Sequence, residues 1–177
     1  MYLVRSFKNG DEKQIVWLIN NTWRDAYKDI FPSVVFDERD KTADKRIEAF
    51  ESNLIKNNRI CYVIKEGDKI VAAMIGSLKT DILEFDAKNY ARLIALYVDK
   101  NYQHMGLGKQ LFDKFVEVLK QRNAKNFIIG VLEKNIKARK AYEKWGGILT
   151  NYSELFTVCD VSRTEVFYEY DVNNINS

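Results

Sequence analysis

A strand, a glycine-containing loop, a helix and a second strand follow one another over residues 92–132, and this unit constrains the fold more than any other stretch. The first strand is the apolar run RLIALYV and the second is NFIIGVL. Between them, apolar side chains recur every four residues, a spacing that places them on one face of a helix. They are Leu107, Leu111, Phe115 and Leu119. A helix that joins two strands in this way packs on a sheet, so the unit indicates a layered domain containing both helices and strands.

The segments on either side continue this mixture. Ahead of the unit, the sequence predicts a strand in YLVRSF, a helix in DEKQIVWLINNTWRDAY, another from about Glu38 to Lys56, and a hairpin of RICYVIK and KIVAAMIGS. Behind it come a short helix, IKARKAYEKW, and the strands ILTNYSELFTV and TEVFYEYDV. The expected order is βααβββαβαββ. We therefore predict an α/β (α+β) fold in which a mixed central sheet of six to seven strands is flanked by about four helices.

Composition restricts the class of protein. The chain has 177 residues, 46% of them hydrophobic, and a single proline, so we expect a single domain over residues 1–177. Its 28 basic and 25 acidic residues are spread along the chain and give a net charge of +3, so we expect no nucleic acid partner. No apolar run approaches the roughly 20 residues of a membrane span, and the N-terminus lacks the form of a signal peptide. We expect a cytoplasmic protein that does not contact a membrane.

Few residues are suited to metal or nucleophilic chemistry. The single histidine, His104, cannot supply a metal cluster, so we expect no metal. Cys61 and Cys159 lie far apart in apolar or β-rich stretches, which predicts buried free thiols in a reducing compartment. A Ser-His-Asp or Cys-His site is disfavoured because it would have to use His104 from inside the glycine loop.

The glycine loop itself, QHMGLG at Gln103–Gly108, has the properties of an anion site. Glycine adopts positive φ and lets a ligand approach the backbone, while the first turn of a helix has N–H groups without intrahelical partners. Together these features favour a phosphate group. A P-loop is disfavoured because Lys109 is followed by Gln110, and a dinucleotide fingerprint would need a third glycine.

The pattern that does match is Q-x-x-G-x-G directly after a strand and before an amphipathic helix. It resembles the acetyl-CoA pyrophosphate loop of the GNAT superfamily of N-acetyltransferases. A second match is NIKARKAYEKWGG, Asn135–Gly147, where Ala follows Asn by three residues and Tyr-Glu-Lys and Gly close a short helix. TWRDAYKDIFP, Thr22–Pro32, is similar to the first-helix region of many bacterial members. The resemblance covers most of the chain and is strongest from Arg92 to Gly147.

This resemblance implies a fold and an activity. The sheet would be GNAT-like, and the single N-acetyltransferase domain would have substrate-side helices in residues 1–58 and an acetyl-CoA-binding core in residues 92–147. The protein would transfer acetyl from acetyl-CoA, its co-substrate, to a primary amine of a small molecule or peptide, as polyamine and peptide amine acetyltransferases do. It would act as a monomer or homodimer. The alternative is a non-catalytic acyl-CoA-binding sensor or interaction module of the same fold.

The resemblance also implies which residues form the site. Backbone N–H groups from His104 to Lys109 would bind the pyrophosphate, and the strand ending at Val98 would bind the pantetheine arm. Asn135 would hydrogen-bond that arm or hold the strands apart. Tyr142 would protonate the departing thiolate as the general acid; without the family pattern, it would be a packing residue, one of ten tyrosines. The expected cofactor-binding residues are Leu96, Tyr97, Val98, Gln103, His104, Met105, Gly106, Leu107, Gly108, Lys109, Asn135, Ala138 and Tyr142.

The general base is left open by the sequence. Many members have a glutamate at the start of the strand before the loop, and Arg92 occupies the aligned position here. We therefore expect water-mediated or distributed deprotonation of the amine, with no single essential carboxylate. By chain region alone, the candidate carboxylates are Glu84, Glu133, Asp25 and Asp29.

Two other groups of residues have a structural interpretation. Trp17, Trp23 and Tyr27 recur at helical spacing and are interpreted as core and cap rather than as a substrate cage. The acidic residues between Asp37 and Glu48 are interleaved with lysine and arginine, which is typical of a solvated charged helix. His104 is expected to point to solvent.

Overall fold

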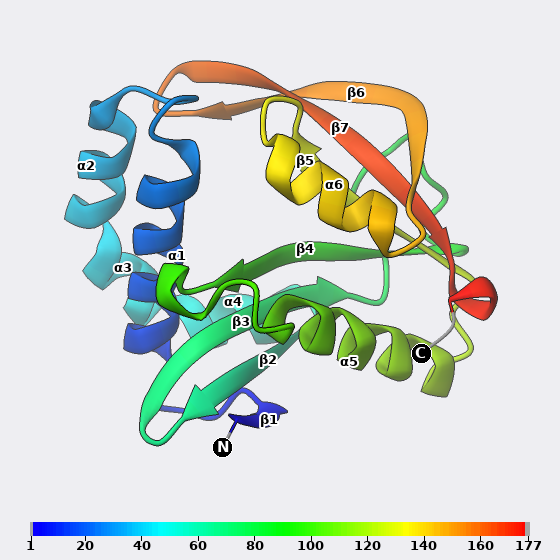
Figure 1. Ribbon diagram of the computed structural model, residues 1–177, viewed down its shortest axis with the longest axis horizontal. Coiled ribbons are helices and arrows are strands. Elements are labelled where there is room, and N and C mark those ends of the chain that lie inside the picture. Colours follow the sequence, from blue (N-terminus) through cyan, green and yellow to red (C-terminus); the bar gives the residue numbers. More distant parts are fainter. Residues whose placement is uncertain (1, 176–177) are drawn as a thin grey trace. The chain divides into compact units, whose positions relative to one another are not determined.

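The computed structural model describes residues 2–175, so the predicted domain limits at 1 and 177 lie outside the described residues. Within this range the chain forms a seven-stranded sheet in the order β1-β2-β3-β4-β5-β7-β6, together with six α-helices (Figure 1). The predicted α/β fold and its seven strands are confirmed, while six α-helices are found where about four were predicted. The elements are β1 (Tyr2–Ser6), α1 (Glu12–Tyr27), α2 (Ser33–Lys41), α3 (Ala43–Glu48), α4 (Phe50–Lys56), β2 (Arg59–Glu66), β3 (Lys69–Ser77), β4 (Tyr90–Val98), η1 (Lys100–Tyr102), α5 (Leu107–Gln121), β5 (Asn126–Leu132), α6 (Ile136–Lys144), β6 (Ile148–Val158), β7 (Val161–Asp171) and η2 (Val172–Asn174).

The helix predicted from Glu38 to Lys56 is divided into three short helices, α2, α3 and α4. The junction residues Thr42 and Ala49 have ψ angles of 4° and −4°, which interrupt regular helix geometry. At the first junction the Thr42 hydroxyl donates to the Glu38 carbonyl at 2.8 Å, a local bond that competes with the helical pattern. Apolar periodicity identified the buried positions but not these breaks.

The chain divides into two compact units. The first contains the chain up to Ile75 together with Ala95–Phe112, and the second contains Gly76–Ile94 together with the chain from Asp113 onwards. In the first unit, buried side chains from α1, α3, α4, β2 and β3 form one core, consisting of Ile15, Val16, Leu18, Ala43, Phe50, Leu54, Cys61, Val63, Ile70 and Ala73. The helical periodicity of α1 predicted its contribution to this core.

An ion pair joins β1 to the beginning of α1. Arg5 contacts the Asp11 carboxylate through two bonds, of 2.6 and 2.8 Å, and the backbone N–H of Lys8 donates to the same carboxylate at 2.8 Å. The Arg5 hydrogen bonds are the main reason that the pKa of Asp11 lies below its usual value. The N-terminal strand is therefore fixed to the first helix by a charged, largely buried contact.

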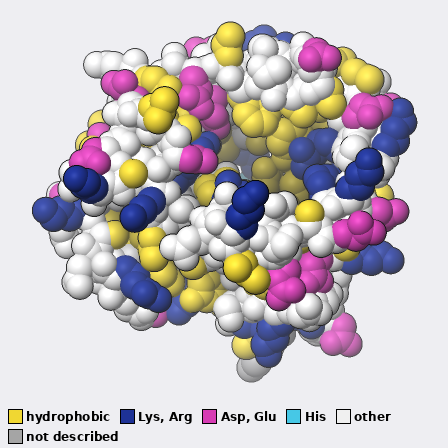
Figure 2. Space-filling view, turned by 180° about the vertical axis from the view of Figure 1, so that it is seen from behind, with side chains coloured by type: hydrophobic (Ala, Val, Ile, Leu, Met, Phe, Trp, Pro, Cys, Tyr) yellow, Lys and Arg dark blue, Asp and Glu magenta, His cyan; other side chains and the backbone are white. Residues whose placement is uncertain are grey.

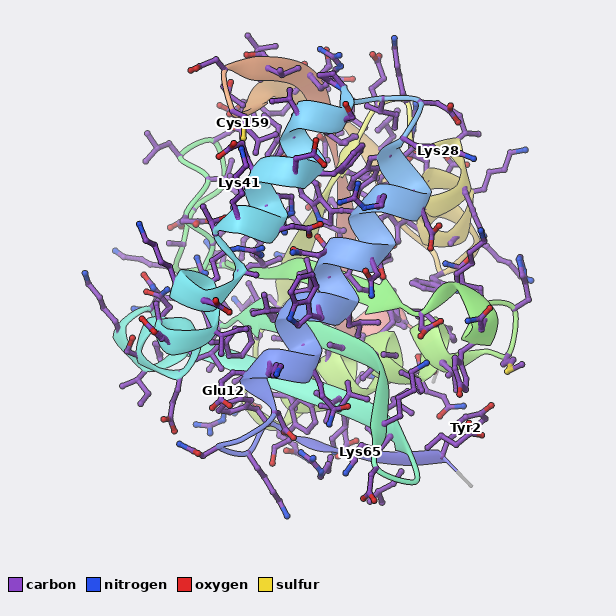
Figure 3. The ribbon with its side chains drawn as sticks, turned by 90° about the vertical axis from the view of Figure 1, so that its left-hand side faces the viewer. Tyr2, Glu12, Lys28, Lys41, Lys65 and Cys159 are labelled. Atoms are coloured by element: carbon purple, nitrogen blue, oxygen red, sulfur yellow. The ribbon has the colours of Figure 1, made fainter. Side chains whose placement is uncertain are left out.

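The charged side chains of α2 pair with one another and with α1. Figure 3 shows α1 extending from Glu12 to just before Lys28, with α2 beside it. Arg24 on α1 contacts Asp40 at 2.6 Å, and Lys41 contacts Glu38 at 2.6 Å. Basic and acidic side chains are likewise interspersed on the face shown in Figure 2. The interpretation of this segment as a solvated charged helix fits these exposed pairs.

In the second unit, β5 lies between β4 and β7. Residues Tyr90–Leu93 pair in parallel with Asn126–Ile129, and β7 pairs antiparallel with the whole of β5. The long β6 and β7 form a hairpin (orange and red in Figure 1) that turns at Cys159 and Asp160, whose φ angles are 48° and 59°. Positive φ at both turn residues is typical of a tight hairpin turn. Cys159 is exposed there, so the prediction that it is buried is wrong, while Cys61 is buried and both thiols are free.

The two faces of this part of the sheet have different neighbours. On one face, Phe127 of β5 packs edge-to-face against Phe115 of α5 and stacks on Tyr170 of β7, with ring centroids 5.4 and 4.6 Å apart. On the other face, a buried cluster is joined by partly buried aromatic rings. The cluster is formed by Ile82, Ile128 and Phe167, and the rings belong to Phe85, Tyr90 and Tyr152.

Candidate active site

The glycine loop lies in the first unit, between the end of β4 and the start of α5. The Gln103 side chain donates to the Val98 carbonyl at 3.2 Å and so ties the loop to the end of the strand. His104 and Gly106 both have positive φ, 66° and 77°, and α5 begins at Leu107. The first N–H groups of a helix have no intrahelical partners, and left-handed residues beside them form an anion-binding concavity.

The side chains of the loop differ in exposure. His104 and Met105 are exposed, as predicted for the histidine, while Leu107 is buried and anchors the first turn of α5. The Tyr2 hydroxyl donates to the Met105 sulfur at 3.2 Å. At Gly106 a side chain would be strained by the positive φ, although no atom lies within 4 Å of the Cβ position. The glycine is therefore required by conformation and leaves open space beside it.

The predicted strand residues Leu96, Tyr97 and Val98 also lie in the first unit, beyond the segment of β4 that pairs with β5. The Tyr97 hydroxyl accepts a hydrogen bond from the Trp23 indole at 2.9 Å. Trp23 is buried, and the Arg39 guanidinium lies 3.9 Å from the centre of its ring. Trp23 is thus a core residue, as predicted, and it orients the tyrosine at the end of the strand.

The other two aromatic residues of α1, Trp17 and Tyr27, are less buried than Trp23. Trp17 is 37% exposed, so its interpretation as a core residue is wrong. Tyr27 is half-buried and packs edge-to-face on Trp23, with ring centroids 5.0 Å apart. The ring of Tyr27 therefore covers one side of the buried indole.

Asn135 and Ala138 lie in the second unit, where they begin α6. The Asn135 side-chain oxygen accepts from the Ala138 N–H at 3.3 Å, which makes Asn135 the N-cap of the helix. The backbone N–H of Asn135 donates to the Leu132 carbonyl at 2.8 Å, whereas among residues 2–175 no hydrogen bond uses its side-chain nitrogen, Nδ2. The cap leaves this nitrogen as a donor toward a ligand.

Tyr142 is fixed in place through its backbone and its ring. Its carbonyl accepts from the Tyr170 hydroxyl at 2.8 Å and from the Gly147 N–H at 2.9 Å. Its ring is buried between Tyr168 and Trp145, with centroid separations of 6.1 and 5.8 Å. The ring that carries the predicted general acid is therefore held in one orientation.

Residues 20–147 match the model of the Acetyltransferase (GNAT) family. The chain belongs to the acetyltransferase (GNAT) family. By family it is an acyltransferase, and the resemblance found in the loop and in α6 is confirmed. An uncharacterized N-acetyltransferase in the pepI 3' region of Lactobacillus delbrueckii subsp. lactis is 31% identical over 102 residues, which are 55% of this chain. The match spans 58% of that relative's length.

Solved structures share the GNAT fold with this chain. The PaiA N-acetyltransferase of Thermoplasma acidophilum, in complex with coenzyme A, has a TM-score of 0.75 at 16% identity, covering 96% of this chain and 99% of that one. YncA of Salmonella typhimurium, a putative acetyltransferase with its cofactor acetyl-CoA, has a TM-score of 0.68 at 12% identity, covering 99% and 96%. At such identities the likeness establishes the fold, and both neighbours contain coenzyme A or its acetyl form.

Four carboxylates were candidates for the general base because of their positions along the chain. The structure does not bring them together in one site. Glu84, Glu133, Asp25 and Asp29 are all exposed. Asp25 lies 3.5 Å from Lys100 in an exposed ion pair.

A carboxylate that the sequence interpretation missed is Glu165 on β7. It is half-buried and lies opposite Leu132 of β5 and Glu154 of β6. Its signal in the sequence is a charged residue that alternates with Phe167 in an otherwise β-type segment. That signal is ambiguous, because alternation alone does not tell whether the glutamate faces solvent or neighbouring strands.

Arg92, in the position where many GNAT relatives have glutamate, lies in the second unit and forms an ion pair with Asp81 at 2.5 Å. Its Nε atom is buried and has no hydrogen-bond partner among the described residues.

No cluster of three His, Cys, Asp or Glu side chains suited to a metal ion occurs in residues 2–175. In the same range, no helix has the length and apolarity needed to cross a membrane.

Proposed function

We propose that this protein transfers the acetyl group of acetyl-CoA to a primary amine of a small molecule or peptide. The observation that carries the proposal is the loop with left-handed residues His104 and Gly106 directly before the first turn of α5. This arrangement offers several backbone N–H groups and the positive end of a helix dipole to one phosphate-bearing ligand.

The chain offers distinct groups to each part of acetyl-CoA. The backbone from His104 to Lys109 would hold the pyrophosphate, and the main chain of Leu96–Val98 would bind the extended pantetheine arm as an added strand does. The side-chain nitrogen Nδ2 of Asn135, which the capping bond of Oδ1 leaves available, would donate to the same arm. Each of these groups matches the chemistry of one part of acetyl-CoA, the anionic pyrophosphate or the hydrogen-bonding pantetheine arm.

Tyr142 would supply the proton that the reaction requires at sulfur. When an amine attacks a thioester, the C–S bond breaks and its electron pair remains on sulfur as a thiolate. The Tyr142 hydroxyl donates its proton to that thiolate, and the nitrogen of the new amide returns a proton to the tyrosine. Acetyl transfer therefore occurs by direct attack in a ternary complex, without an acetylated enzyme side chain.

The acceptor and the setting are also part of the proposal. We infer a cytoplasmic, bacterial protein, which the free thiols of Cys61 and Cys159 and the bacterial relatives support. Cys61 is no nucleophile, because burial raises the pKa of its thiol to about 12. The acceptor is an amine because amines are the substrates implied by the N-acetyltransferases that this chain resembles.

A thiol-release assay tests this function. Acetyl-CoA is offered with separate panels of polyamines, amino acids, aminoglycosides and N-terminal peptides, and the N-acetyl product is identified by mass spectrometry. We expect turnover with one panel, and thermal stabilisation by acetyl-CoA and CoA. Stabilisation without turnover on any panel would instead favour a non-catalytic acyl-CoA sensor, and the absence of both would contradict the proposal.

A further inference from the structure

The paired strands β5 and β7 have one face turned away from Tyr142. On that face β7 carries a carboxylate, Glu165, that the reaction described above does not use. On β7, Tyr168 and Tyr170 contact Tyr142, so alternation along the strand turns Glu165 to the other face. Gly130 of β5 lies directly against it, since a Cβ atom at Gly130 would come within 2.5 Å of Glu165 Oε1. The absence of a side chain at Gly130 makes the space that the carboxylate occupies.

The neighbouring residues partly bury the Glu165 carboxylate but do not pair it with a positive charge. Among residues 2–175, no hydrogen bond or ion pair joins its carboxylate to another group. The charged groups around it are Arg92 on β4, Asp81 ahead of β4, and Glu154, its register partner on β6. Burial is the main reason that the pKa of Glu165 is raised; Arg92 lowers it, while the charges of Glu154 and Asp81 raise it.

We propose that Glu165 is the general base of acetyl transfer and takes a proton from the ammonium group of the acceptor. The inference rests on the proposed function and adds its missing catalytic residue. The ammonium R–NH3+ gives one proton to the Glu165 carboxylate, and the freed lone pair forms the C–N bond to the carbonyl carbon. The C–S bond then breaks, with the tyrosine proton going to sulfur and a second nitrogen proton restoring Tyr142. Glu165 finally releases its proton to water, so each ammonium yields one amide, one thiol and one H+.

The position suits this division of labour. Glu165 and Tyr142 lie on opposite faces of the β5–β7 pair, so the two groups do not exchange a proton directly. Arg92 pairs with Ile128, whose partner on β7 is Glu169, so it lies on the Glu165 face. The arginine thus occupies the β4 position where many relatives have a carboxylate, while this chain carries one on β7, across the same face.

Basicity favours Glu165 over the exposed carboxylates. An ordinary glutamate, with a pKa of about 4.3, accepts a proton from an alkylammonium only poorly. Partial burial, together with the negative charges of Glu154 and Asp81, raises the pKa of Glu165 toward the pH at which the enzyme works. The other candidates, Glu84, Glu133, Asp25 and Asp29, are exposed. Because Glu165 remains half-buried rather than enclosed, its proton can leave to water after each turnover.

The first test compares Glu165→Gln with a matched control, Glu169→Gln. Glu169 lies on the same strand and face, but its carboxylate is held by the Tyr90 hydroxyl at 2.6 Å. We expect Glu165→Gln to lower turnover near neutral pH by about a hundredfold or more without changing acetyl-CoA affinity, and the control to stay close to wild type. The deficit should shrink as pH rises, because the acceptor then loses its proton without help.

Two acceptors that differ only in amine pKa sharpen this test. A trifluoromethyl group on the carbon that bears the nitrogen lowers the pKa of the ammonium below the assay pH, so this amine is largely neutral and needs little base. With this acceptor the deficit of Glu165→Gln should fall below about tenfold. A merely structural role would give the same deficit with both acceptors at every pH, and that result would overturn the inference.

A readout without substrate uses the melting temperature of the ligand-free protein. Since the pKa of Glu165 is raised on folding, its ionised form opposes folding above the folded pKa and has little effect at about pH 3, well below the ordinary pKa of about 4.3, where it is protonated in both states. Glu165→Gln should therefore melt higher than wild type at pH 8 and equally at about pH 3. Equal melting at both pH values would overturn the inference.

The outcomes separate the two proposals. If wild type acetylates an amine and Glu165→Gln does so equally at every pH, the general-base inference fails and the proposed function stands. If wild type releases no thiol with any amine, the proposed function fails, and the inference fails with it.

Discussion

The glycine loop of the first unit and the β5–β7 face of the second unit are constructed in opposite ways. The loop consists of consecutive residues, Gln103–Lys109, and the role proposed for it uses backbone groups whose directions follow from two positive φ angles and a helix start. The β5–β7 face combines Glu165 with Arg92 and Gly130 from separate strands, and it depends on register. A backbone site tolerates changes in its side chains, whereas a register site is sensitive to a single methyl group.

Tyr142→Phe tests the proposed general acid, which lies on α6 in the second unit, and has the largest expected effect. The ring and its packing remain, so turnover should fall by about a hundredfold to ten-thousandfold with little change in stability. Tyr168→Phe is the control, because the Tyr168 hydroxyl donates to Glu143 at 2.6 Å and so has a structural task. It should lose about 1 kcal/mol of stability and keep near-normal turnover. Equal turnover of Tyr142→Phe and wild type over the pH range, with normal acetyl-CoA affinity, would remove Tyr142 from the mechanism.

Gly106→Val tests whether the loop acts through its backbone. Gly10 offers a matched control, since both glycines have positive φ, 77° and 98°, and nothing lies within 4 Å of either Cβ position. Both variants should lose about 1–3 kcal/mol of folding free energy through strain. The Gly106 variant alone should also lose acetyl-CoA affinity, by roughly tenfold or more, as measured by calorimetry. Equal affinity in the two variants would mean that phosphate groups do not bind at this loop.

Gly130→Ala tests the register site with one methyl group. The new Cβ atom would meet the Glu165 carboxylate and the Phe167 ring, at 2.5 and 2.9 Å, so we expect a loss of about 1–3 kcal/mol and about tenfold in turnover. Gly76→Ala is the control, because its methyl group would press on Phe115 instead. It should lose comparable stability in denaturant titrations, while turnover per folded molecule stays near wild type. A similar fall in turnover in both variants would argue against a local effect at Glu165.

The smallest expected effect contrasts the pH responses of the two units. The pKa of Asp11 is lowered, so its pair with Arg5 stabilises the fold above the ordinary carboxyl pKa of about 3.9 and is lost as pH falls through the folded value. Asp11→Asn should lose about 1–2 kcal/mol at pH 7, a deficit that closes at strongly acid pH. This is opposite in sign to the effect expected for Glu165→Gln. Chemical denaturation at pH 7 and pH 3 measures it, and a constant deficit would contradict the assigned ion pair.

Sequence interpretation succeeded where the information is local. Apolar periods identified the strands and α5, and the spacing of Gln103, Gly106 and Gly108 identified the loop together with its family. It failed where the outcome depends on single dihedral angles, as at Thr42, which interrupts a periodic helix, and at Cys159, whose turn exposes a thiol that was predicted to be buried.

Glu165 illustrates a third kind of limit. Its alternation with Phe167 was visible, but its basicity depends on Glu154, Asp81 and Arg92, which strand pairing and loop folding bring near it. The register that sets these neighbours is determined by bulges and hairpin turns, such as the irregularity between Leu149 and Ser153. No local pattern specifies such a register in advance.

The exposed turn at Cys159 has a practical consequence. The chain has two thiols, and the other, Cys61, is buried. A maleimide dye should therefore attach at the tip of the β6–β7 hairpin in the unaltered protein, without engineered cysteines. Fluorescence anisotropy of that single dye would report the mobility of the hairpin tip, with and without an added acceptor.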